Sequence, residues 1–134
     1  MTSEQTLIVI KPDAFKRSLT GRILSRLEDK GFKIKDLKLF DFTIQQAEEF
    51  YSSHRGKPFF NELVSFITSG TVVGCILEGN NAINAVRIII GSTKSFEAAA
   101  GTIRGDYGLG VTDNIIHASD SSESFIKESR VIFS

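Results

Sequence analysis

Apolar and polar residues follow one another along this chain in patterns that predict strands and helices in turn. Residues 6–10 are continuously aliphatic or β-branched, which is typical of a strand buried on both faces, and Pro12 ends it because proline has no amide donor. Residues 20–30 place their apolar side chains on one helical face, and Gly31 suits the position after a helix. Along residues 32–42 the apolar phase changes, which predicts a strand with a bulge or bend.

The second half of the chain continues this alternation. Helical spacing returns at residues 45–53 and 59–68, residues 72–77 read as a strand, and residues 81–90 read as a helix that ends at Gly91. The glycine-bearing stretch of residues 91–113 predicts a long loop, and long ordered loops are more often functional than not. A short strand at 115–116 and a helix near 120–128 follow. The order predicts one α/β (α+β) sandwich, a single domain of residues 1–134.

Composition narrows the possible partners. Lys+Arg and Asp+Glu both number 16, so no net field draws the chain to nucleic acid or to anionic lipid, and we expect neither a nucleic-acid nor a membrane partner. No apolar run approaches the roughly 20 residues that a membrane helix needs, and no secretory signal opens the sequence. The only cysteine, Cys75, lies in an apolar run and is expected to be buried. These features favour a cytoplasmic location.

His117 is the first candidate for chemistry. It follows the predicted last strand and precedes a helix for which Asp120 and Glu123 have the spacing of a capping box. A strand-to-helix turn presents a side chain beside unpaired helix N–H groups, which attract anions, and imidazole is mostly neutral and nucleophilic near pH 7. The position therefore favours attack on a phosphate, with a purely structural histidine as the alternative.

Three cationic side chains strengthen the first interpretation. Lys11 ends a buried strand, Arg87 lies beside the apolar face of a predicted helix, and Arg104 lies among loop glycines. Singly each could be a solvated side chain, but together they supply the positive charge that phosphoryl transfer needs around the equatorial oxygens. Thr93 and Asn114 could add hydrogen bonds to phosphate or sugar, or could be turn and cap residues.

Other nucleotide and metal motifs do not fit the sequence. Thr93 stands before Lys94 and Ser95 where a Walker A loop needs glycine, and the glycines at 105 and 108 do not link a strand to a helix as a dinucleotide fingerprint requires. One cysteine and two distant histidines form no recognisable zinc pattern. We therefore expect no metal held by protein side chains.

Four segments resemble the signatures of the nucleoside diphosphate kinase family in their order and spacing. They are IKPDA at residues 10–14, RGKPFF at 55–60, GTIRGD at 101–106 and NIIHASDS at 114–121, and the match extends over roughly residues 5–130. The resemblance implies a ferredoxin-like fold with a four-stranded antiparallel sheet covered by helices. It also implies ping-pong transfer of the γ-phosphate from a nucleoside triphosphate, typically ATP, to a nucleoside diphosphate through a phosphohistidine on His117.

The resemblance implies a role for each matched site residue. Four would act at the reacting centre: His117 as nucleophile, Glu128 as acceptor for the ring nitrogen that does not attack, with Ser119 nearby and Tyr51 beside the nucleophile. Lys11 would hold phosphate and a ribose hydroxyl, and Arg87, Thr93 and Arg104 would hold the phosphates. Asn114 would hold the ribose, Phe59 would stack on the base, and Val111 would touch it. Stacking on a π-face predicts broad base specificity. Mg²⁺ would be held by the nucleotide phosphates, and the chain would form a homo-oligomer, a hexamer or a tetramer.

The sequence departs from the family pattern at a few positions. Ala118 stands where the family usually has glycine, Lys94 and Ser95 stand where it has asparagine and proline, and Ala100 stands where it has proline. None of these changes removes a contacting side chain. They motivate one alternative, a catalytically weak member that serves as a binding or scaffolding protein. A nucleic-acid-binding ferredoxin-like module is a second alternative, against which the zero net charge argues.

Overall fold

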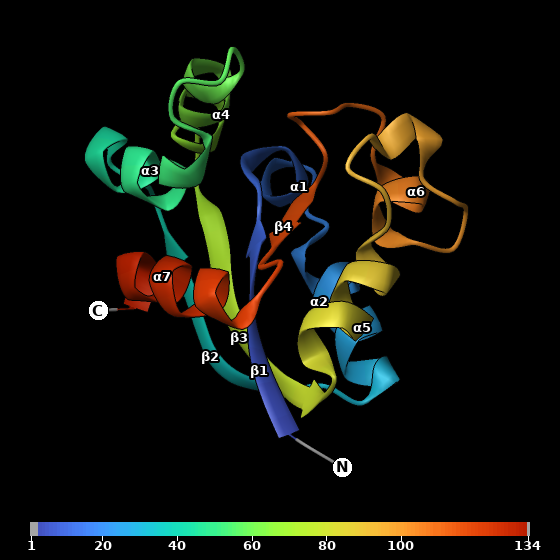
Figure 1. Cartoon of the computed structure of the whole chain (residues 1–134). Coiled ribbons are helices and arrows are strands. Elements are labelled where there is room, and N and C mark those ends of the chain that lie inside the picture. Colours follow the sequence, from blue (N-terminus) through green and yellow to red (C-terminus); the bar gives the residue numbers. More distant parts are fainter. Residues whose placement is uncertain (1–2, 134) are drawn as a thin grey trace.

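The computed structural model describes residues 3–133 and contains one four-stranded sheet (Figure 1). Its strands are β1 (Ser3–Ile10), β2 (Lys33–Phe40), β3 (Val72–Asn80) and β4 (Ile116–Ala118), in the order β2-β3-β1-β4. Each neighbouring pair is antiparallel. The predicted four-stranded antiparallel sheet covered by helices is confirmed.

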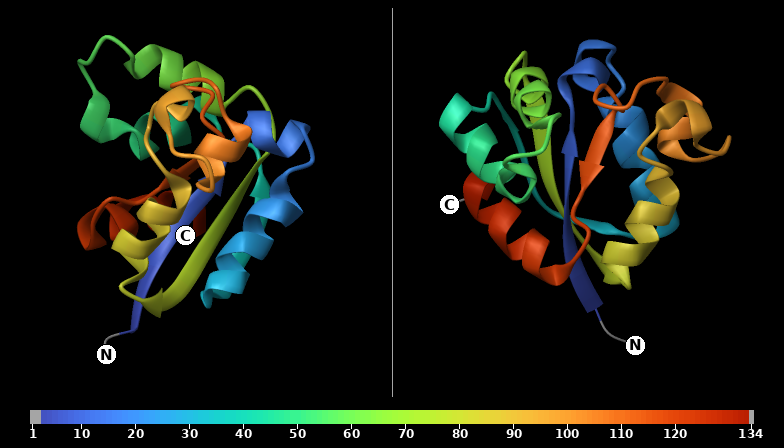
Figure 2. Two further views of the ribbon diagram at one scale, coloured as in Figure 1. Left: turned by 90° about the vertical axis from the view of Figure 1, so that its right-hand side faces the viewer. Right: turned by 45° about the horizontal axis from the view of Figure 1, so that its top comes forward.

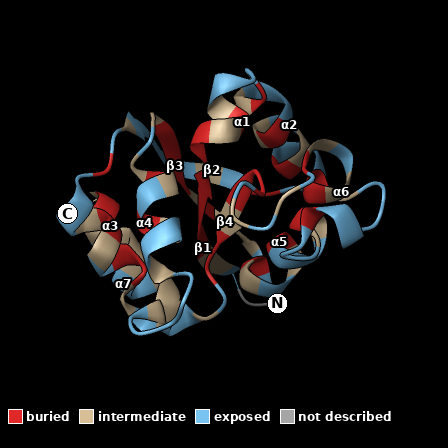
Figure 3. Ribbon diagram, turned by 90° about the horizontal axis from the view of Figure 1, so that it is seen from above, coloured by how far each residue is buried: buried red, intermediate tan, exposed pale blue. Residues whose placement is uncertain are grey.

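Helices cover both faces of this sheet (Figures 2 and 3). One face carries α1 (Pro12–Lys16), α2 (Thr20–Lys30), α5 (Ala82–Ile90) and α6 (Ile103–Tyr107), and the other carries α3 (Ile44–Phe50), α4 (Phe60–Ile67) and α7 (Ser122–Phe133). Two single-turn 3₁₀ helices, η1 (Ser52–His54) and η2 (Ser95–Glu97), lie in the connections. Within residues 3–133, none of the helices combines the length and the apolar character needed to cross a bilayer.

β1 lies in the middle of the molecule because both of its faces are apolar. Successive side chains of a strand point to opposite faces, so Ile8 and Ile10 enter the core beneath α2 and α5, while Leu7 and Val9 enter the core beneath α3, α4 and α7. All four are fully buried. The continuous apolar run therefore makes β1 a central strand of the sheet. Lys11 follows the last residue of β1 and so lies at the end of this central strand.

The edge strand β2 contains the predicted irregularity. Ile34 pairs with Leu77 and Asp36 pairs with Ile76, so Lys35 is an extra residue between them, as in a β-bulge. The prediction from the change of apolar phase is confirmed.

Cys75 on β3 is buried as expected, and burial raises the pKa of its thiol to about 12.

Three local predictions differ from the structure. The five-residue helix α6 lies within the predicted long loop, and the five-residue helix α1, which the sequence analysis did not predict, follows the correctly predicted end of β1. His117 is the middle residue of β4 and does not lie in the turn after it. Ser121, not Asp120, caps α7, because its Oγ accepts the Ser124 N–H at 3.0 Å, and the expected capping box is therefore wrong.

Candidate active site

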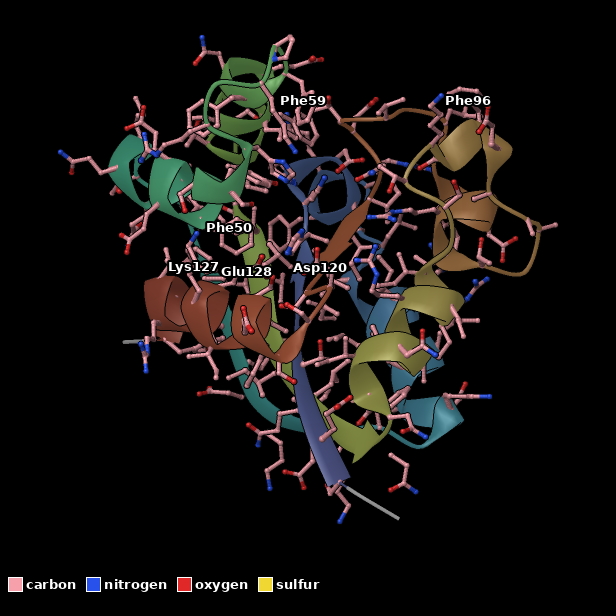
Figure 4. The ribbon with its side chains drawn as sticks, in the orientation of Figure 1. Phe50, Phe59, Phe96, Asp120, Lys127 and Glu128 are labelled. Atoms are coloured by element: carbon pink, nitrogen blue, oxygen red, sulfur yellow. The ribbon has the colours of Figure 1, made fainter. Side chains whose placement is uncertain are left out.

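A cavity of about 610 Å³ opens at one end of the central strands (Figure 4). Residues of α4, α5, α7, β4 and the segment 91–114 line it. In Figure 4, Phe59 lies beside α4 at the upper end, and Asp120 and Glu128 lie lower, beside α7. Ten of the predicted site residues line the cavity: Lys11, Tyr51, Phe59, Arg87, Thr93, Arg104, Val111, Asn114, His117 and Glu128.

His117 is held from two sides. Its backbone pairs with Val9 of β1, and the Phe50 ring packs edge-on against the imidazole at a centroid distance of 4.9 Å. Nε2 lies 2.9 Å from Oε1 of Glu128. An ionised carboxylate only accepts hydrogen bonds, so this contact places the ring proton on Nε2 and leaves the lone pair on Nδ1.

Ser119 is the one predicted site residue that does not line the cavity. It is completely buried, and its Oγ donates to the same Glu128 oxygen at 2.7 Å. The hydroxyl and the imidazole therefore fix one carboxylate oxygen from two directions. Such a partner orients the histidine ring and sets its tautomer.

Lys11 is buried at the end of β1, with 5% of its surface exposed. Its Nζ donates to Oδ1 of Asn114 at 2.7 Å and to the carbonyl of Thr112 at 3.2 Å. Burial, with the nearby Arg104 charge, lowers the pKa of Lys11 to about 7, although Asp13 and Asp113 oppose that shift. An anion beside Nζ would therefore strongly stabilise the charged form of Lys11.

Arg104 comes from α6 and is 7% exposed. Its guanidinium donates to three backbone carbonyls, through Nε to Asn114 at 3.2 Å, through Nη1 to Gly91 at 3.0 Å and through Nη2 to Ile116 at 2.6 Å. Burial and the neighbouring Arg87 lower the pKa of Arg104 to about 10, so it remains charged at neutral pH. Arg87 itself donates to the carbonyl of Ala118 at 3.1 Å.

The remaining predicted residues complete the wall and the rim. Tyr51 is buried with its ring centroid 6.3 Å from that of His117, and burial, with the Glu128 charge, raises the pKa of its hydroxyl. Phe59 and Val111 are 41% and 46% exposed and form an apolar rim. Thr93 is exposed, and its carbonyl accepts from Nδ2 of Asn114 at 2.8 Å.

Several lining residues were not predicted as site residues. His54 is partly buried and lines the cavity, and burial together with Lys57 and His117 lowers its pKa. Asp120 and Ser124 line the cavity as well, joined by a hydrogen bond of 2.6 Å. The only sequence signal for His54 was its place just before the RGKPFF segment.

The cavity has a cationic part that can hold an anion, although four carboxylates, those of Glu62, Asp113, Asp120 and Glu128, line it as well. The cations are Lys11, between β1 and α1, Arg87 on α5 and Arg104 on α6. Among residues 3–133, no group of three or more His, Cys, Asp or Glu side chains gathers that could hold a metal ion. A neutral imidazole with a directed lone pair, beside three cations, can accept a phosphoryl group.

The fold and the cavity together define a ferredoxin-like α+β domain with a cavity in which a histidine lies near three cations. Its residues 4–134 match the family model described as nucleoside diphosphate kinase. Proteins named nucleoside diphosphate kinase from Staphylothermus marinus and Thermoplasma acidophilum are 56% and 55% identical to it. These alignments cover 99% and 98% of this chain and 94% and 88% of the two relatives. The chain belongs to the nucleoside diphosphate kinase family.

Solved structures agree with the sequence comparison. The nucleoside diphosphate kinase of Aquifex aeolicus superposes with a TM-score of 0.96 at 49% identity, over 99% of this chain and 96% of that one. The enzyme of Halobacterium salinarum in complex with CDP superposes with a TM-score of 0.95 at 42% identity, over 99% of this chain and 89% of that one. The similarity therefore covers the whole domain and the region of the cavity.

Proposed function

We propose that this protein is a nucleoside diphosphate kinase that carries the γ-phosphate of a nucleoside triphosphate, typically ATP, to a nucleoside diphosphate on His117. The observation that carries the proposal is the contact of 2.9 Å between Nε2 of His117 and Glu128, inside a cavity lined by three cations. A ring fixed in this way directs Nδ1, the nitrogen with the lone pair, at a bound phosphate. Family membership agrees with this chemistry.

The reaction runs in two half-reactions. In the first, Nδ1 of His117 forms a bond to the γ-phosphorus while the bond from phosphorus to the bridging oxygen breaks, and the electron pair leaves with the nucleoside diphosphate. The proton stays on Nε2, where Glu128 stabilises the positive charge that develops on the ring. In the second half-reaction, the terminal oxygen of another nucleoside diphosphate forms a bond to the phosphorus of the phosphohistidine while the bond from phosphorus to Nδ1 breaks, and the electron pair returns to Nδ1 of the neutral imidazole.

Different parts of the cavity would bind different parts of the nucleotide. We assign the phosphates to Lys11, Arg87, Thr93 and Arg104, because guanidinium forks and an ammonium neutralise the charge on the transferred group. Asn114 would bind the ribose. Phe59 and Val111 would hold the base at the exposed rim, and contact with a π-face is tolerant of base identity. The CDP complex of the H. salinarum enzyme fits such a tolerant site.

Mg²⁺ is the cofactor that we assign to the reaction. The cavity supplies cations for a phosphate chain, and the divalent ion would enter with the nucleotide, held by its phosphate oxygens. When bound, Mg²⁺ neutralises phosphate charge and organises the oxygens. We further propose that residues 1–134 act as one domain, in the cytoplasm, within a homo-oligomer.

One labelling experiment tests the proposal. Purified protein with γ-labelled ATP and Mg²⁺, but no acceptor, should gain protein-bound label that is labile to acid and stable to alkali, as phosphohistidine is. Adding a nucleoside diphosphate should discharge it. His117→Ala should gain no label, and retained transfer in this variant would refute the assignment. Nucleotide binding without label in the wild type would instead favour the scaffolding alternative.

A further inference from the structure

Residues 114–116, at the start of β4, form an unusual turn. Ile115 has φ of +78°, and the N–H of Ile116 donates to the carbonyl of Asn114 at 2.9 Å. A three-residue turn with positive φ at its centre is a rare and strained γ-turn, and a β-branched residue in that region is an outlier. Strain of this kind persists only where the surroundings fix it. The turn lies two residues before His117.

Four groups hold this turn from both sides. The Lys11 N–H donates to the carbonyl of Ile115 at 2.9 Å, and Lys11 Nζ donates to the Asn114 side chain at 2.7 Å. Arg104 donates to the carbonyls on either side of Ile115, those of Asn114 and Ile116. The N–H of Ile115 itself donates to Oδ2 of Asp13 at 3.1 Å.

Asp13 differs from the other holding groups. Lys11 and Arg104 line the cavity, whereas Asp13 does not, so it has no direct contact with a bound nucleotide to explain it. It lies on α1 and its second oxygen, Oδ1, is buried without a hydrogen-bond partner among the described residues. Burial raises the pKa of its carboxyl, while the N–H groups of Ile115 and Ala14 lower it. A half-satisfied buried carboxylate is costly for stability alone.

We propose that Asp13 is a positioning residue for phosphoryl transfer, because its carboxylate fixes the Ile115 N–H and thereby holds the strained turn of residues 114–116. The inference rests on the proposed function. The peptide between Asn114 and Ile115 points its N–H at Asp13 and its carbonyl at Arg104. If that peptide turned over, Arg104 would lose this acceptor. Asp13 therefore helps to set the place of Arg104, a cation of the proposed phosphate site, from outside the cavity.

The test compares three variants in one assay, the rate at which label from saturating γ-labelled ATP appears on His117 in a single turnover. Asp13→Ala removes the acceptor and should slow this step about tenfold or more, the equivalent of releasing one strained backbone conformation. Asp13→Asn keeps a neutral acceptor oxygen and should recover part of the rate. Glu4→Ala is the matched control. The Glu4 carboxylate also accepts a backbone hydrogen bond, from the Ile83 N–H at 2.9 Å, but Glu4 does not line the cavity. The rate of this variant should stay within about twofold of wild type.

A double-mutant cycle separates positioning from general stability. Glycine adopts positive φ without strain, so in an Ile115→Gly background the turn needs less support, and Asp13→Ala should cost less than about threefold in rate. Because Ile115 is fully buried, Ile115→Gly also removes core packing; if this background does not fold, the comparison of Asp13→Ala and Asp13→Asn with Glu4→Ala decides the inference alone. Should Asp13→Ala fail to fold, the same cycle with the isosteric Asp13→Asn decides. An equal rate penalty in both backgrounds, or an Asp13 variant as fast as Glu4→Ala, would overturn the inference. Absence of label on the wild type would instead refute the proposed function.

Discussion

Nucleotide binding should be coupled to proton uptake by Lys11. In the nucleotide-free protein, burial beside Arg104 lowers the pKa of this lysine to about 7, so near neutral pH about half of the molecules hold it uncharged. A phosphate group beside Nζ stabilises the charged form and raises this pKa toward its ordinary value. The complex then binds more protons than the free protein. Affinity should therefore fall as the pH rises above about 7.

The size of this effect follows from the free-state pKa. Because only the charged lysine pairs with phosphate, affinity should fall about fivefold from pH 7 to pH 8 and about tenfold from pH 8 to pH 9. By the same linkage, Lys11 should make the nucleotide-free protein more stable to unfolding as the pH rises from about 7 to about 8, because the unfolded chain keeps this proton and the native chain loses it. Above about pH 9 the raised thiol pKa of Cys75 acts in the opposite direction.

Titration calorimetry measures this coupling directly. ADP binding is measured at pH 8 in two buffers of different ionisation enthalpy, which gives the number of protons taken up, expected to be about 0.9 per site. At this pH the nucleotide phosphates are already ionised. Lys11→Arg is the control, since a guanidinium stays charged, and it should show no uptake by this position. Wild-type binding without proton uptake at pH 8 would refute the reasoning.

Two further predictions concern the nucleophile and the core. Glu128→Gln keeps an acceptor oxygen for Nε2 of His117 but removes the negative charge that stabilises the ring as it becomes positive, so the single-turnover phosphorylation rate should fall about a hundredfold while ADP affinity changes little; an unchanged rate would contradict this electrostatic role of Glu128. Gly74→Val places side-chain atoms where a Cβ alone would lie 3.0 Å from Ile132 and 3.2 Å from Phe40, so denaturant titration should show a loss of about 1–3 kcal/mol of unfolding free energy. A variant as stable as wild type would show that α7 can move away.

The elements that sequence pattern predicts well are those with a long apolar signal. The apolar run at residues 6–10 predicted β1, because a strand buried on both faces is continuously apolar. The apolar face of residues 20–30 predicted the bounds of α2, because a helix buried on one face has a helical period. Helices α1 and α6 have five residues each, too few for a helical period to show. The cap of α7 was misplaced because a run of serines and acidic residues offers several N-caps of similar strength.

The site was predictable where motif and chemistry coincide, and unpredictable where it depends on long-range geometry. The segments that carry His117, Arg104 and Lys11 are recognisable in sequence, and the structure brings all three to one cavity. No local pattern could show that the Ile115 N–H meets Asp13, because a hydrogen bond across the sheet edge depends on the register of β1 and β4.

The pairing of β1 with β4 also has a consequence for biosynthesis. Asp13 and Ile115 are 102 residues apart in sequence, and the contacts of Lys11 with Thr112 and Asn114 span 101 and 103 residues. Closing so long a segment is entropically costly and contributes to slow folding. We expect the first three strands to form a sheet while the chain is still on the ribosome. In this sheet the side of β1 that later pairs with β4 has no partner strand. The nascent chain therefore acquires its nucleotide site only after nearly all of the polypeptide has been translated.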